Sequence, residues 1–481
     1  MKRMKLKSNT VAIVMAAAGG LVWTNCAPAA SRMVAAAFKP DAEWRNYPTR
    51  TLADLPSSDA FRTDTDLSRY GGWTARKTQA SGFFRTDKVA DRWWLVDPEG
   101  CLFLHKGVAS VRTTDTPGAN AALAARFGSV TNWAVGTTGL LRANGFNGLG
   151  GWSDTEKLRA ANPPLVYTRL WNFMGSYGRK RGGTFQQAGH LGYPNDCIFV
   201  FDPEFERFCN EYAKQLAETK DDPWLLGHFS DNELPFKREA LRNFLDLPPT
   251  DAGHVAARKF LTQRHGGRAV ASDITPQDEQ DFLAIVAARY FEIVSRAVKK
   301  HDPNHLYLGS RFYGSDLRHS ELFKACGPHV DVVSVNWYHA WTPDADKLAM
   351  WARESGRPAL ITEWYAKGAD SGMANTSGAG WLVRTQRDRG LFYQNFTLAL
   401  LESKVCVGWD WFRYMDNDPD DKKVDPSNRD SNKGILNSRY APYEPLLQAM
   451  NELNVRAYSL VDYFDAISQA AQRRQPGDVG D

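Results

Sequence analysis

Two short segments each place a glutamate directly after an apolar run that has the pattern of a β-strand. Residues 224–233 read WLLGHFSDNE and end in Asn232 and Glu233, and residues 358–364 read PALITEW and contain Glu363. A carboxylate in such a place is costly to bury unless it is paired or used. Two carboxylates facing each other across a cleft can hydrolyse a glycosidic bond, one as proton donor and the other as nucleophile. The alternative for each glutamate is a structural ion pair with an arginine.

The distance between the two carboxyl groups would set the stereochemical outcome. At about 5–5.5 Å the second carboxylate forms a covalent glycosyl-enzyme and configuration is retained, whereas about 6.5–9.5 Å leaves room for a water and inverts it. Burial and mutual repulsion would raise the pKa of one group, and this difference would assign the roles of acid and nucleophile.

The elements that must position these glutamates alternate between short apolar segments and helical patterns. One helix is capped by Asp202 with Pro203 at its first position, and another covers residues 282–300. Eight such repeats predict an α/β fold, a (β/α)8 TIM barrel whose chemistry lies at the carboxyl ends of its strands. An open doubly wound sheet is the alternative. The predicted strand segments are 103–111, 145–151, 165–173, 224–233, 305–312, 330–338, 358–364 and 405–412.

Four regions are predicted along the chain. Residues 1–29 form a signal peptide, and residues 30–100 form a small N-terminal β-rich extension made of a surface strap and a β-hairpin. The hairpin is predicted from turn residues DPEG at 97–100 between two apolar runs. Residues 101–465 form the catalytic barrel, and residues 466–481 form a flexible C-terminal tail.

The first residues have the order typical of a secretory signal peptide. A basic start (KRMKLK) precedes an apolar run at 11–23 and the small-residue pattern Ala27-Pro28-Ala29. The run is too short to span a bilayer, so we expect a secreted or periplasmic protein. The alternative is lipid anchoring through Cys26, although Trp23, Thr24 and Asn25 before it match that signal poorly.

Composition excludes several classes of function. With 43% apolar and 24% charged residues, the 481-residue chain is not a disordered one. A net charge of +4 is too small to indicate nucleic acid as the main partner, and no later segment is apolar enough to span a membrane. No H-E-x-x-H, G-x-S-x-G or G-x-x-x-x-G-K-[ST] motif occurs, and the 10 histidines include no His-x-His pair. We therefore expect neither a metal nor a cofactor.

Ordered motifs resemble one group of glycoside hydrolases. WLLGHFSDNELPF and PALITEWYAKGADSGM are similar to the fourth and seventh strand ends of clan-A enzymes. VDPEGCLFLHKGVASV, LRANGFNGLGGWSD, VGWDWFRYMDND and SNKGIL extend the resemblance to the β-agarase families over about residues 90–440. The resemblance implies a retaining hydrolase that cleaves β-glycosidic bonds in a polysaccharide or oligosaccharide substrate, a galactan such as agarose or a related algal galactan, sulfated ones included.

The same resemblance implies roles for individual residues. Glu233 would be the general acid/base and Glu363 the nucleophile. Asn232 would bind the sugar 2-hydroxyl, Tyr338 would orient Glu363, and Trp411 would form the floor of the subsite for the reacting sugar. Trp409 has the same strand parity as Trp411, so both face one side of the strand.

Other polar residues near the predicted strand ends are candidates for substrate binding or for bracing the glutamates. His228 and Asp231 are expected to be structural neighbours of the site. Arg179-Lys180-Arg181, in a predicted loop after strand three, could bind sulfate esters, because guanidinium groups match oxyanions. The remaining candidates are Arg112, Arg311, His339 and Asp416.

Three other functions compete with this interpretation. A non-catalytic saccharide-binding barrel would need the tryptophans but not both glutamates. A clan-A hydrolase acting on a different β-glycan would keep both glutamates and change the subsites. A metal-dependent barrel hydrolase would need several histidines and aspartates at strand ends.

Overall fold

The computed structural model describes residues 32–56, 61–418, 421 and 423–474. The predicted signal peptide and Cys26 lie outside these residues. No helix in the described part is long and apolar enough to cross a membrane.

A curled sheet of eight parallel strands forms the centre of the molecule, in the order β13-β12-β9-β8-β7-β18-β15-β14. Each strand lies inside one of the eight predicted segments, and neighbours in the sheet follow the order of the chain. The strands are β7 (His105–Ala109), β8 (Gly148–Leu149), β9 (Val166–Leu170), β12 (Leu225–Phe229), β13 (Leu306–Tyr307), β14 (Val333–Asn336), β15 (Ala359–Glu363) and β18 (Cys406–Phe412).

The segment that follows β13 meets β14, the other edge strand of this sheet, through one parallel bridge between Phe312 and Val335. The Phe312 amide donates to the carbonyl of Ser334 at 2.9 Å, and the Asn336 amide donates to that of Phe312 at 2.8 Å. Regular pairing ends early in β13 because Gly309 adopts a φ of +72°, a left-handed conformation that breaks a strand. The structure is therefore an α/β protein with a curled parallel sheet, and its ladder is irregular where a strict barrel would close.

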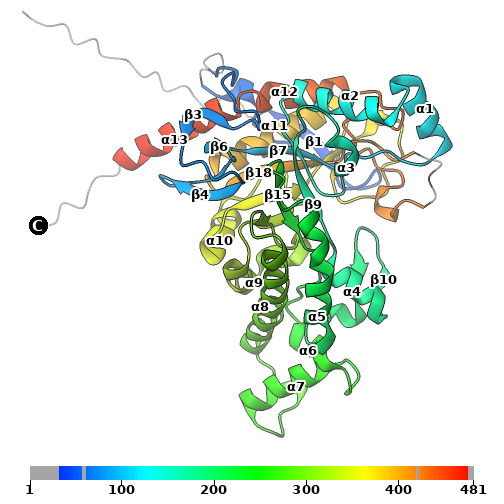
Figure 1. Cartoon of the computed structure of the whole chain (residues 1–481), viewed down its shortest axis with the longest axis vertical. Coiled ribbons are helices and arrows are strands. Elements are labelled where there is room, and N and C mark those ends of the chain that lie inside the picture. Colours follow the sequence, from blue (N-terminus) through cyan, green and yellow to red (C-terminus); the bar gives the residue numbers. More distant parts are fainter. Residues whose placement is uncertain (1–31, 57–60, 419–420, 422, 475–481) are drawn as a thin grey trace, which may run out of the picture.

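Helices cover the outside of the sheet. Figure 1 shows α1, α2 and α12 on one side of it and α5, α8 and α9 on the other, with α6 and α7 at the far end. The helices are α1 (Pro117–Phe127), α2 (Val130–Ala143), α3 (Thr155–Leu158), α4 (Phe173–Arg181), α5 (Pro203–Tyr212), α6 (Ala240–Leu245), α7 (Ala252–His265), α8 (Pro276–His301), α9 (Ser320–Cys326), α10 (Ala345–Ser355), α11 (Gln386–Glu402), α12 (Glu444–Asn454) and α13 (Ala457–Arg474).

Helix α8 begins earlier than the apolar pattern alone predicts. Thr275 caps it, with its hydroxyl accepting from the Asp278 amide at 3.2 Å, and Pro276 occupies the first position. The first turn is polar, so it does not contribute to the apolar stripe by which the helix was recognised. Helix α5 begins as predicted, with the Asp202 side chain accepting from the Glu204 amide.

The N-terminal region is more regular than the predicted strap. Strands β1 (Met33–Ala37) and β2 (Arg45–Pro48) join β16 (Ala366–Gly368) and β17 (Trp381–Val383) in one sheet. β2 pairs with β1 nearby, but β1 pairs with β17 more than three hundred residues away, so local sequence gives no signal for that second pairing.

The predicted hairpin around residues 97–100 is confirmed. Strand β5 (Arg92–Val96) pairs antiparallel with β6 (Cys101–Phe103) across that turn. Strands β3 (Trp73–Lys77) and β4 (Arg85–Val89) complete a four-stranded sheet.

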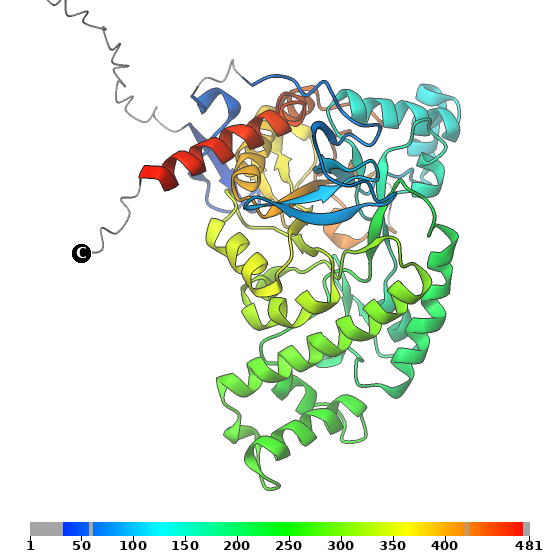
Figure 2. The same ribbon diagram turned by 60° about the vertical axis from the view of Figure 1, so that its left-hand side comes forward.

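The prediction of a flexible tail from residue 466 is wrong for residues 466–474. Helix α13 continues to Arg474, and Figure 2 shows it running along the N-terminal strands. Its Asp465 forms an ion pair at 2.7 Å with Arg92, which is 1% exposed. This anchor, followed by good helix-forming residues, keeps the segment helical.

Candidate active site

A cleft of about 350 Å³ opens at the carboxyl ends of the sheet strands. Glu233, after β12, and Glu363, at the end of β15, both line it. They are 8% and 5% exposed, so each is largely desolvated and still reaches the cleft. The fold therefore brings the two candidate carboxylates into one cleft, although they lie 130 residues apart in the chain.

Glu363 is held by three side chains. Arg311 lies 2.8 Å from its Oε1, the Tyr338 hydroxyl donates to its Oε2, and the Trp152 indole donates to Oε1 at 3.4 Å. Burial raises the pKa of Glu363, the Arg311 charge lowers it and the Glu233 charge raises it, with a net upward shift. The predicted contact between Tyr338 and Glu363 is present.

Glu233 has a different environment from Glu363. Its Oε1 accepts a hydrogen bond from the side-chain amide of Asn336 at 2.9 Å, and its Oε2 lies 3.4 Å from His190 Nδ1. No described cation contacts it as Arg311 contacts Glu363. Its φ is +52°, an uncommon conformation for a residue other than glycine and one found at functional sites.

Asn336 connects the two sides of the site, and the sequence analysis did not single it out. Its side-chain nitrogen donates to Glu233 and, at 3.1 Å, to Oδ1 of Asn232, while its Oδ1 accepts from the Thr362 hydroxyl at 2.8 Å. Asn232 lines the cleft as predicted. The sequence did contain a signal for Asn336, because it is a polar residue at the end of the sixth predicted strand, in the motif VSVNWY.

The predicted role of Trp411 and Trp409 is wrong. Both are fully buried on the helix side of β18: the Trp411 indole donates to the Lys433 carbonyl, and that of Trp409 to the Tyr393 hydroxyl of α11. Asp410 between them faces the inside of the sheet, where it meets His105 at 2.9 Å.

Strand parity puts both tryptophans on one side of β18 without saying which side, and the ladder to β15 is irregular just before them. Ala359 pairs with Cys406, but Leu360 pairs with Gly408, so the ladder skips one residue of β18. Phe412, on the opposite side of the strand from Trp411, is the aromatic residue of β18 that lines the cleft.

The other candidates divide into three groups. Arg112 lines the cleft, as predicted. Arg311 is fully buried and braces Glu363, which was one of its two predicted alternatives. His339 and Asp416 do not line the cleft, so the prediction that they bind substrate is wrong.

Local contacts explain both exclusions. His339 lies in an exposed turn, with its ring 5.0 Å from that of Phe38. Asp416 is buried and its carboxylate accepts hydrogen bonds within the loops after β18, from Asn432, Gly434 and Tyr443.

The basic cluster Arg179-Lys180-Arg181 lies in the last turn of α4, not in a loop as predicted. Only Arg179 lines the cleft. Arg181 is engaged in ion pairs at 2.9 Å with Asp202 and Asp251. The three residues therefore do not act as one anion-binding group.

Asp231 braces the strand-four end, as expected. It accepts from the Met174 and Gly175 amides at 2.9 and 3.0 Å and from the Tyr290 hydroxyl at 2.6 Å. Burial raises its pKa to about 6, against the effect of these hydrogen bonds.

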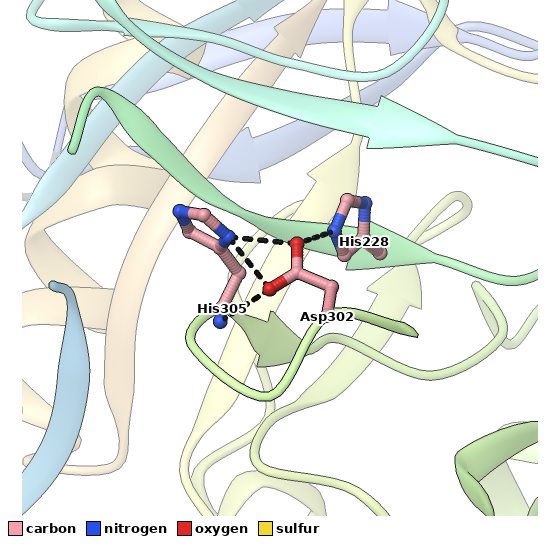
Figure 3. Close-up of side chains that lie close together, drawn as sticks. All are labelled: His228, Asp302 and His305. Carbon is pink, nitrogen blue, oxygen red and sulfur yellow. Dashed lines mark hydrogen bonds and ion pairs between the residues drawn. The ribbon is translucent and has the colours of Figure 1, made fainter. Parts of the chain in front are cut away.

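His228, Asp302 and His305 form the cluster whose atoms could hold a metal ion among the described residues. Figure 3 shows the Asp302 carboxylate between the two rings. It lies 2.7 Å from His228 Nε2 and 2.8 Å from His305 Nδ1. A metal-bound histidine donates its other ring N–H to an acceptor. His228 Nδ1 instead faces a donor, the Trp171 indole at 2.9 Å, so Nε2 carries the hydrogen. The three side chains therefore form a hydrogen-bonded relay, by which we mean the chain of contacts from His228 through Asp302 to His305, and their hydrogen positions do not fit metal coordination.

Several cleft residues were missed by sequence reasoning. Trp152 lies inside the motif LRANGFNGLGGWSD, so its signal was present. His190 comes from the hairpin of β10 (Phe185–Gln186) and β11 (Leu191–Gly192), where no pattern marks it. The other missed lining residues with large side chains include Tyr313, Tyr365, Arg413, Asp425 and Lys433.

Paired carboxylates at the carboxyl ends of parallel strands are the arrangement that glycoside hydrolases use. No family model matches the chain. The solved structure of BpGH50 is 32% identical with a TM-score of 0.79, covering 90% of this chain and 96% of its own. The chain therefore belongs to the GH50 family of β-agarase-like glycoside hydrolases.

More distant proteins agree with this membership. β-Agarase B of Vibrio sp. (strain JT0107) is 26% identical over 82% of this chain and 50% of its own length, and β-agarase A of that strain is 28% identical over 74% and 40%. The chain thus spans half or less of the length of these curated relatives. An exo-β-agarase structure, 22% identical with a TM-score of 0.69 over 85% of this chain and 69% of its own, shares the fold.

Proposed function

We propose that the protein hydrolyses β-glycosidic bonds of an agarose-type galactan with retention of configuration. The observation that carries the proposal is the convergence of Glu233 and Glu363 in one cleft of a GH50 fold. Two β-agarases among the relatives support the choice of galactan. The proposal includes a (β/α)8 barrel, with the Phe312–Val335 bridge as its closing contact, and secretion through the predicted signal peptide.

The Arg311 ion pair and the Tyr338 hydrogen bond support Glu363 as the nucleophile, whereas the net upward shift of its pKa, taken alone, is the direction expected of the acid. Glu363 attacks the anomeric carbon as a carboxylate, and Arg311 and the Tyr338 hydroxyl stabilise that charge. Glu233 donates its proton to the leaving oxygen and then deprotonates the water that releases the glycosyl-enzyme. When Glu363 forms the glycosyl ester it loses its negative charge. Glu233 can then stay ionised without that repulsion, which favours its second role as the base.

Neighbouring amides complete the proposed site. Asn232 binds the 2-hydroxyl of the reacting sugar, a contact that strengthens in the transition state. Asn336 fixes both Asn232 and Glu233 by hydrogen bonds at 3.1 and 2.9 Å. The cleft wall formed by Trp152 and Phe412 offers aromatic surface for sugar rings.

Agarose oligosaccharides incubated with the wild type and with two variants test this proposal. Glu363→Gln should abolish turnover, and Glu233→Gln should slow it by about 10²- to 10⁴-fold, least for substrates with good leaving groups. A 2-deoxy-2-fluoro galactoside with an activated leaving group should label Glu363, as detected by peptide mass. Glu402→Gln, at a half-exposed surface ion pair, is the control. Full activity of either cleft variant, or inverted products, would refute the mechanism.

A further inference from the structure

Arg413, directly after β18, is a buried cation without a partner among the described residues. It is 2% exposed and lines the cleft, and its Nε is buried without any acceptor. No described side chain or carbonyl accepts a hydrogen bond from its guanidinium group. A buried charge is costly unless it is paired and hydrogen-bonded, so a group from outside the protein is expected to complete this site.

The other buried arginines of the described chain each have an oxygen partner, although Arg311 also keeps Nε and Nη1 without an acceptor. Arg92 pairs with Asp465 at 2.7 Å and Arg311 with Glu363 at 2.8 Å. Arg389 donates to three oxygen atoms at 2.6–2.9 Å, from the Ala366 and Gly434 carbonyls and from the Gln386 side chain. Each of these three guanidinium groups thus has at least one partner within the described protein, whereas that of Arg413 has none and lines the cleft.

Two more cations lie beside Arg413. Arg112 lines the same cleft and forms no ion pair with a described residue. Lys433 donates to the neutral Asn428 side chain at 2.7 Å and lies over the rings of Tyr365 and Phe412. Burial and then the Arg413 charge lower the pKa of Lys433 to about 7, and burial and then the Arg112 charge lower that of Arg413 to about 10. The three cations therefore repel one another in the free protein.

The carboxylates around them are committed to other groups. Glu363 is held by Arg311 and Tyr338, and Asp425 by the Gly189 amide and the Gln186 side chain. Asp416 and Asp421 attract Arg413 only through space, without a hydrogen bond. Glu363 also attracts Arg413 and Lys433 through space, and Asp425 attracts Lys433, but no described carboxylate forms an ion pair with Arg112, Arg413 or Lys433.

We infer that Arg112, Arg413 and Lys433 form a subsite for an oxyanion carried by a sugar unit of the substrate. Guanidinium forks bind sulfate and carboxylate through paired charge-assisted hydrogen bonds, and Lys433 adds a point charge. A sulfate ester on a galactan is the ligand we favour, with the carboxylate of a uronic acid as the other source of the same chemistry. The inference rests on the proposed hydrolase function, because the subsite adjoins Glu363.

Thermal unfolding tests the subsite without turnover. Sodium sulfate at matched ionic strength should raise the melting temperature of the wild type more than sodium chloride does. Arg413→Met and the more exposed Arg112→Met should lose the extra increment and keep only the general salt effect, whereas Arg207→Met on α5 should keep the full increment. Arg413→Met should also leave the free protein as stable as the wild type or more so, because it removes an unpaired charge. A destabilised Arg413→Met with the increment intact would mean a structural role and overturn the inference.

Substrate selectivity tests the ligand. Neutral, sulfated and uronate-bearing oligosaccharides of equal length would be compared by kcat/KM. The ratio for sulfated over neutral chains should fall about 10- to 100-fold in Arg112→Met and in Arg413→Met, the loss expected for hydrogen bonds to a charged group, and stay constant in Arg207→Met. A larger effect with uronates assigns a carboxylate to the same subsite.

Two outcomes separate the subsite from the hydrolase proposal. Equal loss on neutral and charged chains overturns the subsite while leaving hydrolysis intact. No cleavage of any chain, with the sulfate increment preserved, overturns the hydrolase function and keeps the anion site.

Discussion

The Tyr338 hydroxyl donates a hydrogen bond to the carboxylate of Glu363. Removing that hydroxyl therefore tests how the proposed nucleophile is held and ionised. Tyr338→Phe should reduce kcat about 10- to 100-fold, the cost of a hydrogen bond to a charged group. Burial raises the pKa of Glu363 and the Tyr338 contact is one of those that lower it. Without it that pKa rises, so the acidic limb of kcat against pH should move to higher pH.

Tyr463→Phe on α13 is the matched control for this measurement, because it removes a tyrosine hydroxyl from a helix outside the cleft. A Tyr338→Phe enzyme with lower kcat and an unmoved acidic limb would show that the tyrosine does not act on the ionisation of Glu363.

The residue scale is also where sequence reasoning was least complete. The two glutamates and Asn232 could be found because polar groups that directly follow apolar strands are conspicuous. The burial of Trp409 and Trp411 could not be foreseen, because strand parity places both on one side of β18 without indicating whether that side faces the cleft or the helices. Asn336 and His190 were missed because their roles depend on contacts between distant segments.

At the scale of elements, the relay of His228, Asp302 and His305 ties β12 to the end of α8 and the start of β13. Asp302→Asn should lower the free energy of unfolding by about 1.5–3 kcal/mol, because it weakens the hydrogen bonds that His228 and His305 make to a charged carboxylate. Urea unfolding measures it. Asp221→Asn, which loses only an exposed pair with Lys220, should change stability by less than about 1 kcal/mol.

The pH dependence of stability checks the charge of this relay. Against the effect of burial, hydrogen bonds from His228 and His305 hold the pKa of Asp302 well below its usual value. Such a group stabilises the fold above its unfolded pKa of about 3.9 and loses that effect as pH falls toward its folded value. Wild type and Asp302→Asn should therefore converge in stability below about pH 4. Curves that stay parallel would contradict an ionised Asp302.

The eight sheet strands were all located from the sequence, because each is a short apolar run bounded by turn or cap residues. Strands β1 and β2 were not, since β1 joins the sheet through β17, far along the chain, and β2 pairs with β1. The predicted strict barrel and the observed sheet differ at β13, where the φ of Gly309 ends regular pairing. Periodicity identifies strands well, whereas it does not indicate how the edges of a sheet meet.

At the scale of the whole molecule, α13 attaches the C-terminal part of the described chain to the sheet of strands β3 to β6. Its two aspartates provide an internal comparison: Asp465 pairs with the buried Arg92, whereas Asp462 pairs with Arg76 at the surface, both about half exposed. Asp465→Asn should cost about 3–5 kcal/mol because it leaves a buried charge unpaired. Asp462→Asn should cost less than about 1 kcal/mol.

Thermal or urea unfolding of these two variants, with kcat measured on the folded protein, completes the comparison. The cleft is not contacted by α13, so kcat should stay at the wild-type level in both. Equal stability of the two variants would mean that α13 is held by its apolar side chains and not by the Arg92 ion pair.

The sheet pairs its first strand in the chain, β7, with its last, β18, through five residue pairs. During synthesis on the ribosome, one edge of β7 therefore has no partner until Phe412 has emerged. For most of translation the nascent chain exposes an unsatisfied strand edge that can recruit other chains. Slower elongation should therefore lengthen this vulnerable interval, and chaperone demand should fall once β18 has docked.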